Sequence, residues 1–149
     1  MTERETAVAS NDDNVLLITG ATGLVGSHVA EEARRRNIPT RALVRADSDT
    51  ALLDRWGVEK IVGNMTDADS MRQAVAGAAT VVHCAAKVGD WGPVEEYREV
   101  NVRGLEKLLE AVTAAGSVKR FLHVSSLGVY PARDHHGPDE SEPPKLAAV

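Results

Sequence analysis

The chain has 149 residues and a formal net charge of −5, with 43% hydrophobic, 26% charged and only 3% aromatic residues. This length suits one domain with its own core, and the acidic balance argues against a general nucleic-acid binder, which needs a basic face. No apolar run approaches the ~18 residues of a membrane span, no signal-peptide pattern is present, and a single cysteine fits a reducing compartment, so we expect a cytoplasmic protein.

Residues 1–13 show no periodicity and are predicted to form a disordered tail. From residue 14, short apolar segments alternate with helical patterns. The expected strands are 15–19, 40–44, 59–62, 80–84 and 119–125. The expected helices are 23–36, 48–56, 67–76 and 94–115. This alternation predicts an α/β fold with a doubly wound, Rossmann-type parallel sheet of about five strands, ordered 3-2-1-4-5.

Two helices carry more detailed signals. Thr66 and Asp69 are spaced as a capping box at the start of the third helix. The last helix has an apolar stripe that Gly116 should end. The residues of this stripe are Val100, Leu105, Leu108, Leu109 and Val112. After residue 130 the pattern is lost, and 131–149 are predicted to be loop.

Three glycines follow the first expected strand at intervals of three residues. Gly20 allows a tight turn, Gly23 lets the backbone approach a pyrophosphate, and Gly26 allows the next helix to pack closely on the sheet. The N-terminus of that helix offers free N–H groups to phosphate. The simpler alternative is a turn with no ligand. A P-loop lysine is missing, which argues against nucleoside triphosphate hydrolysis.

The segments "TGATGLVG" (19–26), "VVHCAA" (81–86), "NVRGLEKLLEA" (101–111) and "RFLHVSSLGVY" (120–130) resemble the extended short-chain dehydrogenase/reductase family. This family includes sugar-nucleotide epimerases and dehydratases, dihydroflavonol reductases and 3β-hydroxysteroid dehydrogenases. The resemblance implies an NAD(P)-binding domain at 14–130, a small-molecule substrate with a hydroxyl or carbonyl group, and a homodimer in the full-length protein.

The resemblance also implies roles for individual residues. Those matched to the dinucleotide loop are Gly20, Thr22, Gly23, Leu24, Val25 and Gly26. Asn64 and Met65 match the pair at the adenine edge, where the Asn64 oxygen can accept a hydrogen bond from the adenine amine. The segment under the cofactor is matched by Cys84, Ala85 and Ala86. Asn101 matches an asparagine that supports the cofactor side of the site.

Arg45 occupies the place, about 20 residues beyond the glycine loop, where a carboxylate normally holds the ribose 2′-hydroxyl of NAD. A guanidinium there can bind a 2′-phosphate. Asp47 and Asp49 follow closely and could hold the hydroxyl instead. We expect NADP to be preferred over NAD.

Ser126 matches the family's catalytic serine, with Ser125 as the second choice. A fixed hydroxyl there would stabilise charge on the substrate oxygen, although both serines could simply cap a turn. The family's proton donor is a tyrosine followed four residues later by lysine, about 25 residues beyond the serine. Neither Tyr97 nor Tyr130 has that lysine. The chain as given is therefore expected to bind the cofactor without turnover, and 131–149 to lead toward a missing catalytic helix and substrate-binding region.

Three hypotheses remain open at this point. The first, which we favour, is that the chain is the cofactor-binding half of an NAD(P)-dependent oxidoreductase or epimerase. The second is a non-catalytic module that senses the dinucleotide. The third is an inactive remnant that no longer binds the cofactor. No spacing of cysteine, histidine or carboxylates indicates a metal site.

Overall fold

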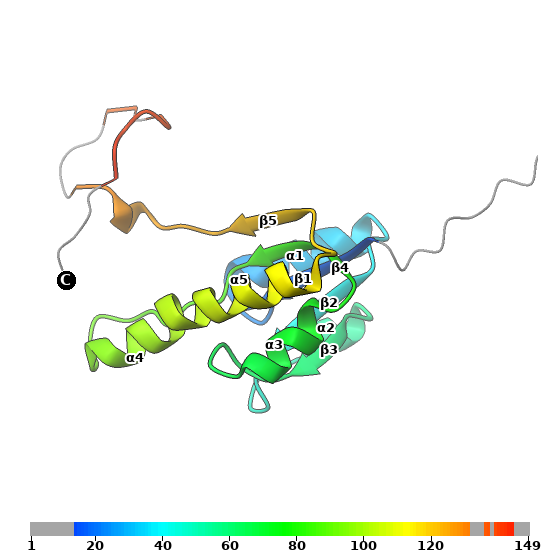
Figure 1. Ribbon diagram of the computed structural model, residues 1–149. Helices are drawn as coiled ribbons and strands as arrows, with labels where there is room; N and C mark the ends of the chain where they lie inside the picture. The colour runs from blue at the N-terminus through cyan, green and yellow to red at the C-terminus, as the bar shows by residue number, and fades with distance from the viewer. Residues whose placement is uncertain (1–13, 132–135, 138, 145–149) are drawn as a thin grey trace, which may run out of the picture.

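Five short strands form one parallel sheet in the order β3-β2-β1-β4-β5, which confirms the predicted topology (Figure 1). The computed structural model describes residues 14–131, 136, 137 and 139–144, so the predicted tail at 1–13 lies outside the described residues. The strands are β1 Val15–Thr19, β2 Thr40–Val44, β3 Glu59–Val62, β4 Ala78–His83 and β5 Arg120–His123.

Helices connect these strands on both faces of the sheet. Their bounds are α1 Leu24–Arg35, α2 Ala51–Arg55, α3 Ala68–Val75, α4 Val94–Arg98, the π-helical turn η2 Glu99–Arg103, α5 Gly104–Ala115 and the 3₁₀ turn η3 Leu127–Val129. No helix in the described part of the chain is both long and apolar enough to cross a membrane.

The alternation of side chains along β1 divides the core into two clusters. Leu16 and Ile18 pack with residues of α1 and α2 on one face of the sheet. Leu17 points to the other face, where it packs with Met71 of α3 and Leu108 of α5. Because both faces of β1 are buried, its sequence is apolar from Val15 to Ile18, as expected for a central parallel strand.

The start of α3 differs from the expected capping box. Asp67, rather than Thr66, is the N-cap residue, and its carboxylate accepts a hydrogen bond from the Asp69 N–H at 3.0 Å. Thr66 is directed back to Asn64 instead. The capping prediction was therefore wrong by one residue, because the aspartate next to the threonine is the more strongly preferred N-cap residue.

The helix expected over 94–115 is continuous but contains the π-helical turn η2 between α4 and α5 (Figure 1). Leu108 is fully buried, whereas Leu109, also placed in the apolar stripe, is 42% exposed, which corrects that assignment. Gly116 ends α5 in the left-handed region with φ +65°, as predicted.

Candidate functional site

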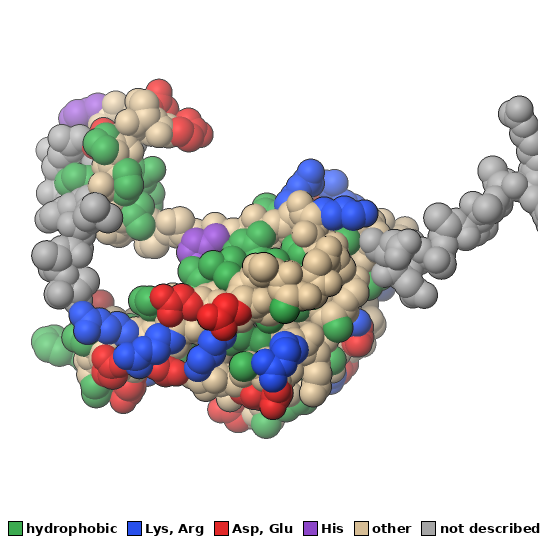
Figure 2. Space-filling model, in the orientation of Figure 1, with side chains coloured by type: hydrophobic (Ala, Val, Ile, Leu, Met, Phe, Trp, Pro, Cys, Tyr) green, Lys and Arg blue, Asp and Glu red, His purple; other side chains and the backbone are tan. Residues whose placement is uncertain are grey.

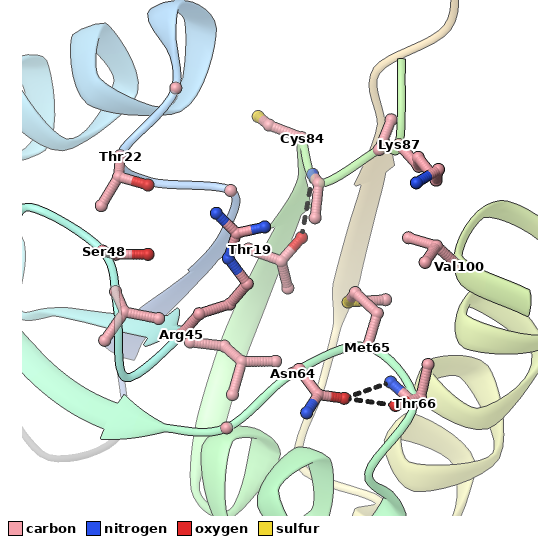
Figure 3. Close-up of a pocket in the computed structure, with 17 residues that line it drawn as sticks. Thr19, Thr22, Arg45, Ser48, Asn64, Met65, Thr66, Cys84, Lys87 and Val100 are labelled. Atoms are coloured by element: carbon pink, nitrogen blue, oxygen red, sulfur yellow. Dashed lines mark hydrogen bonds between the residues drawn. The ribbon is translucent and has the colours of Figure 1, made fainter. Parts of the chain in front are cut away.

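A cavity of about 540 Å³ lies at the carboxyl ends of β1 to β4, where the strand order reverses (Figure 3). Ligands of doubly wound proteins bind at this position. The cavity brings together nine of the residues expected to bind the cofactor: Gly20, Thr22, Gly23, Arg45, Asn64, Met65, Cys84, Ala85 and Ala86.

The remaining expected residues do not line this cavity. Leu24 and Val25 lie at the start of α1, with exposed side chains along a separate apolar groove. Gly26 is buried beneath the loop. Ser125 and Ser126 are exposed just beyond β5, where the Ser126 hydroxyl accepts a hydrogen bond from the Gly128 N–H at 3.2 Å and caps η3.

Two of the three glycines are required by the packing of the protein itself. Gly20 has φ +71°, and a Cβ there would lie 2.7 Å from the Ala85 nitrogen. A Cβ on Gly26 would lie 2.2 Å from the Gly20 oxygen. Both contacts are with backbone, which cannot move aside as a flexible side chain can. These two residues hold the loop between β1 and α1 against β4 and the helix.

Gly23 is different, because the protein leaves room for a side chain there. A Cβ on Gly23 would have its nearest contact at 3.4 Å, an ordinary van der Waals separation, and its φ is −84°. Gly23 is also the N-cap of α1, where no side chain caps the helix and no acidic residue lies in the first turn. The helix N-terminus therefore presents its N–H groups and partial positive charge at the edge of the cavity. These features suit a phosphate.

A buried hydrogen-bond chain joins β1 to β4 at the floor of the cavity. The Thr19 hydroxyl lies 2.7 Å from His83 Nδ1 and accepts a hydrogen bond from the Ala85 N–H at 3.3 Å. Burial, with a smaller contribution from His123, lowers the pKa of His83 to about 4, so the ring is neutral at pH 7. Neutral Nδ1 can accept the Thr19 proton, which leaves the hydroxyl oxygen free to accept from Ala85.

Cys84 lies in the same segment but is not activated. Burial raises the pKa of its thiol, so the nucleophilic thiolate is disfavoured. Its role at the cavity wall is that of a small side chain.

Asn101 lies in η2 and fixes the loop that follows β4. Its Oδ1 accepts a hydrogen bond from the Lys87 N–H at 2.7 Å, and its Nδ2 donates to the Lys87 oxygen at 2.9 Å. Lys87 lines the cavity, and its ammonium group pairs with Glu96 at 2.8 Å. Asn101 therefore acts on the cavity through backbone contacts, from a π-helical turn of the kind often found at functional sites.

The loop after β3 is fixed from the opposite side by α5. Lys107 Nζ donates to the Thr66 carbonyl at 3.0 Å and pairs with Glu99 at 3.2 Å. Gly104 allows α5 to approach closely, since a Cβ there would lie 2.9 Å from the Met65 oxygen. Within the loop, the Asn64 Oδ1 accepts hydrogen bonds from the Thr66 N–H at 2.8 Å and the Thr66 hydroxyl at 2.5 Å (Figure 3). The oxygen expected to accept from an adenine amine is thus already engaged.

Several residues of the cavity wall were not found from the sequence: Thr19, Leu43, Val44, Ser48, Gly63, Thr66, Lys87 and Val100. Thr19, Leu43 and Val44 lie at strand ends; Thr19 is part of the quoted motif 19–26 but was given no role, and the other two are apolar. Ser48 follows Arg45 in the same turn, where its N–H donates to the Arg45 carbonyl at 3.1 Å. The only indication in the sequence that Ser48 lines the cavity was its position three residues after Arg45.

The strand order and the cavity at the switch point define a doubly wound α/β protein of the dinucleotide-binding type. A profile of the NAD dependent epimerase/dehydratase family matches residues 16–147, and the chain belongs to this family.

Individual relatives agree with this assignment. Over 75% of its length, the chain is 38% identical to sterol demethylase protein B of Methylococcus capsulatus, of which it covers 34%. It is 36% identical to an N-acetyl-α-D-glucosaminyl-diphospho-undecaprenol 4-epimerase of Escherichia coli, matching 89% of this chain and 38% of the epimerase. A short-chain dehydrogenase/reductase superfamily structure from Agrobacterium tumefaciens with bound NAD matches with a TM-score of 0.74 and 32% identity, over 89% of this chain and 39% of that one. The chain spans about a third of the length of the curated relatives it matches.

Proposed function

We propose that this chain is the cofactor-binding half of an NAD(P)-dependent oxidoreductase or epimerase/dehydratase. The observation that carries the proposal is Gly23, a glycine that the protein's own packing does not require, at the uncapped N-terminus of α1 beside the cavity. A ligand backbone or phosphate approaching this point explains the missing side chain. The proposed cofactor domain is 14–130, followed by a connecting segment at 131–149.

The chemistry of the cavity wall fits a dinucleotide laid across it. The pyrophosphate is proposed to lie against Gly20 and Gly23. The adenine would lie beside Asn64 and Met65, and the nicotinamide toward Ala85 and Ala86. The bound nicotinamide would supply hydride transfer, and this chain's residues would bind and orient it.

The substrate chemistry belongs to the whole protein. We propose that Ser126 donates a hydrogen bond to a substrate hydroxyl or carbonyl oxygen there, since its oxygen only accepts from the Gly128 N–H and its own proton is free to donate. Relatives named for sterols and for a lipid-linked sugar are both similar to this chain, so the proposal extends to a small molecule with a hydroxyl or carbonyl group and no further. A homodimer is proposed for the full-length protein.

Calorimetric titration of the chain with NAD and NADP tests the cofactor site. Micromolar to millimolar binding of either one, abolished by excess of the other, supports it. No binding by the folded chain would contradict it and favour the inactive remnant.

We predict that NADP binds about tenfold more tightly than NAD, because a guanidinium and a 2′-phosphate form a charge-assisted pair. The Arg45 side chain is largely exposed beside the cavity, and its Nε lies 3.3 Å from the Asp47 carboxylate. Arg45→Asp should reverse the preference. Asp47→Asn is the matched variant, because removing the competing carboxylate should strengthen NADP binding. Tighter binding of NAD by the unmutated chain would show that the carboxylates, rather than Arg45, define the ribose site.

The contact between Lys107 of α5 and the loop after β3 leads to a second prediction, about binding of the adenine nucleotide. Lys107→Met removes the hydrogen bond to the Thr66 carbonyl and should weaken AMP binding about fivefold, the equivalent of one lost hydrogen bond. Glu99→Gln is the control, because it removes the ion pair with Lys107 and leaves the bond to Thr66. Equal weakening by both variants would mean that the ion pair, and not the loop contact, matters. Calorimetry with AMP and thermal melting of both variants provide the measurements.

A further inference from the structure

The hydrogen-bonding capacity of the Asn64 side-chain oxygen is used up within its own loop. An amide oxygen has two lone pairs, and here they accept from the Thr66 N–H at 2.8 Å and the Thr66 hydroxyl at 2.5 Å. A backbone N–H can only donate, so the atom facing it must be the oxygen. The orientation of the amide is therefore set by its neighbours, which is how such assignments are made.

The surrounding contacts hold this arrangement in place. The Asp67 N–H donates to the Asn64 carbonyl at 3.2 Å, which closes the turn. Lys107 holds the Thr66 carbonyl at 3.0 Å, and Met65 is packed against Gly104. A ligand that required the Asn64 oxygen would have to compete with both bonds from Thr66 in a loop braced by α5.

The Asn64 amide nitrogen is the group left for a ligand. No residue in the described part of the chain accepts a hydrogen bond from Nδ2, and Asn64 lines the cavity. Figure 3 shows this nitrogen directed away from Thr66. Nδ2 is a donor with two protons and no acceptor capacity, so it matches an acceptor on the edge of a base.

We propose that this site, if it holds the base of the dinucleotide as the proposed function requires, does not recognise the 6-amino group of adenine. The amine is itself a donor toward Nδ2, and two donors form no hydrogen bond. An aspartate at position 64 would keep one oxygen for Thr66 and offer the other to the amine. Asn64 instead makes the site tolerant of purine nucleotides that lack the amine, including those with a hydrogen or an acceptor at position 6.

The test compares AMP with purine riboside 5′-monophosphate, which differs only in lacking the 6-amino group. Calorimetric titration of the unmutated chain should give dissociation constants that agree within about threefold. Asn64→Asp should bind AMP about tenfold more tightly than purine riboside 5′-monophosphate, since a hydrogen bond to a charged acceptor contributes about that factor. The variant retains an acceptor for Thr66, and its melting temperature checks that the loop is intact.

Thr66→Val provides a second, uncharged variant. It removes the hydroxyl and frees one lone pair of the Asn64 oxygen, so a preference for AMP of a few-fold should appear. A tenfold preference for AMP in the unmutated chain, unchanged in Asn64→Asp, would overturn the inference while leaving the dinucleotide site standing. If the folded, unmutated chain binds neither nucleotide, the proposed function fails and the inference with it.

Discussion

Gly26→Ala is expected to lower the free energy of unfolding by about 3 kcal/mol, at the upper end of what overpacking costs. The added Cβ would lie 2.2 Å from the Gly20 oxygen and 2.9 Å from the Ala21 Cα. Neither backbone atom can rotate away, so α1 must move off the loop that joins it to β1. Urea denaturation followed by circular dichroism measures the loss. A variant as stable as the unmutated chain would mean that α1 and the loop are not packed as described.

Gly23→Ala is the matched substitution three residues earlier, and it should weaken dinucleotide binding while leaving the stability nearly unchanged. Its Cβ has room, so stability should fall by about 1 kcal/mol or less, the usual cost of alanine at an N-cap. Dinucleotide binding should weaken at least about tenfold, because the methyl group occupies the space proposed for the pyrophosphate. Calorimetric titration of Gly26→Ala and Gly23→Ala separates a glycine needed for folding from one needed for dinucleotide binding. Unchanged dinucleotide binding by Gly23→Ala would show that the pyrophosphate does not lie against Gly23.

Acidification from pH 6.5 to 4 is expected to destabilise the chain through His83. This side chain is only 2% exposed, and its pKa is lowered from 6.5 to about 4 by burial and by His123. In that window the unfolded chain binds a proton that the folded chain excludes, so stability rises with pH and is fully present above pH 6.5. The full effect is about 3 kcal/mol.

The contribution of His83 can be isolated from that of the carboxylates. His83→Asn places an amide near Nδ1, where its oxygen can accept from Thr19, and does not titrate. Its free energy of unfolding should depend less on pH between 4 and 6.5 than that of the unmutated chain. His28→Gln is the control, because His28 is exposed on α1. An unchanged pH slope in His83→Asn would show that His83 does not titrate in this range.

The strand order was predictable because each buried strand is a short apolar run and the connections between them are short. Gly20, Gly23 and Arg45 line the cavity, since their positions follow from where β1 and β2 end. Lys87 was not predicted, because the conformation of its loop depends on Asn101, 14 residues away. Ser48 was not predicted, although its contact with Arg45 is local.

The same limit explains the errors within helices. Asp67 and Thr66 are adjacent residues that can both cap a helix, and the Thr66 hydroxyl is engaged by the Asn64 oxygen, which leaves the cap to Asp67. Leu109 was assigned to the apolar stripe because it lies at helical spacing from Leu105 and Val112. Within α5 the buried face is formed by Gly104, Leu108 and Ala111, so Leu109 lies at the edge of that face and is exposed.

The π-helical turn η2 makes the orientation of α4 depend on the number of residues between α4 and α5. It accommodates one residue more than an α-helical turn. A one-residue deletion within 99–103 that restored regular α-helix would rotate α4 by about 100° relative to α5. Glu95 would then leave Arg103, its partner at 2.6 Å, and Tyr97 would leave the Trp91 carbonyl that it now contacts at 2.8 Å. A change in the length of this turn would therefore reorient α4 as a unit against the loop that follows β4, which α4 contacts at Trp91 and Lys87.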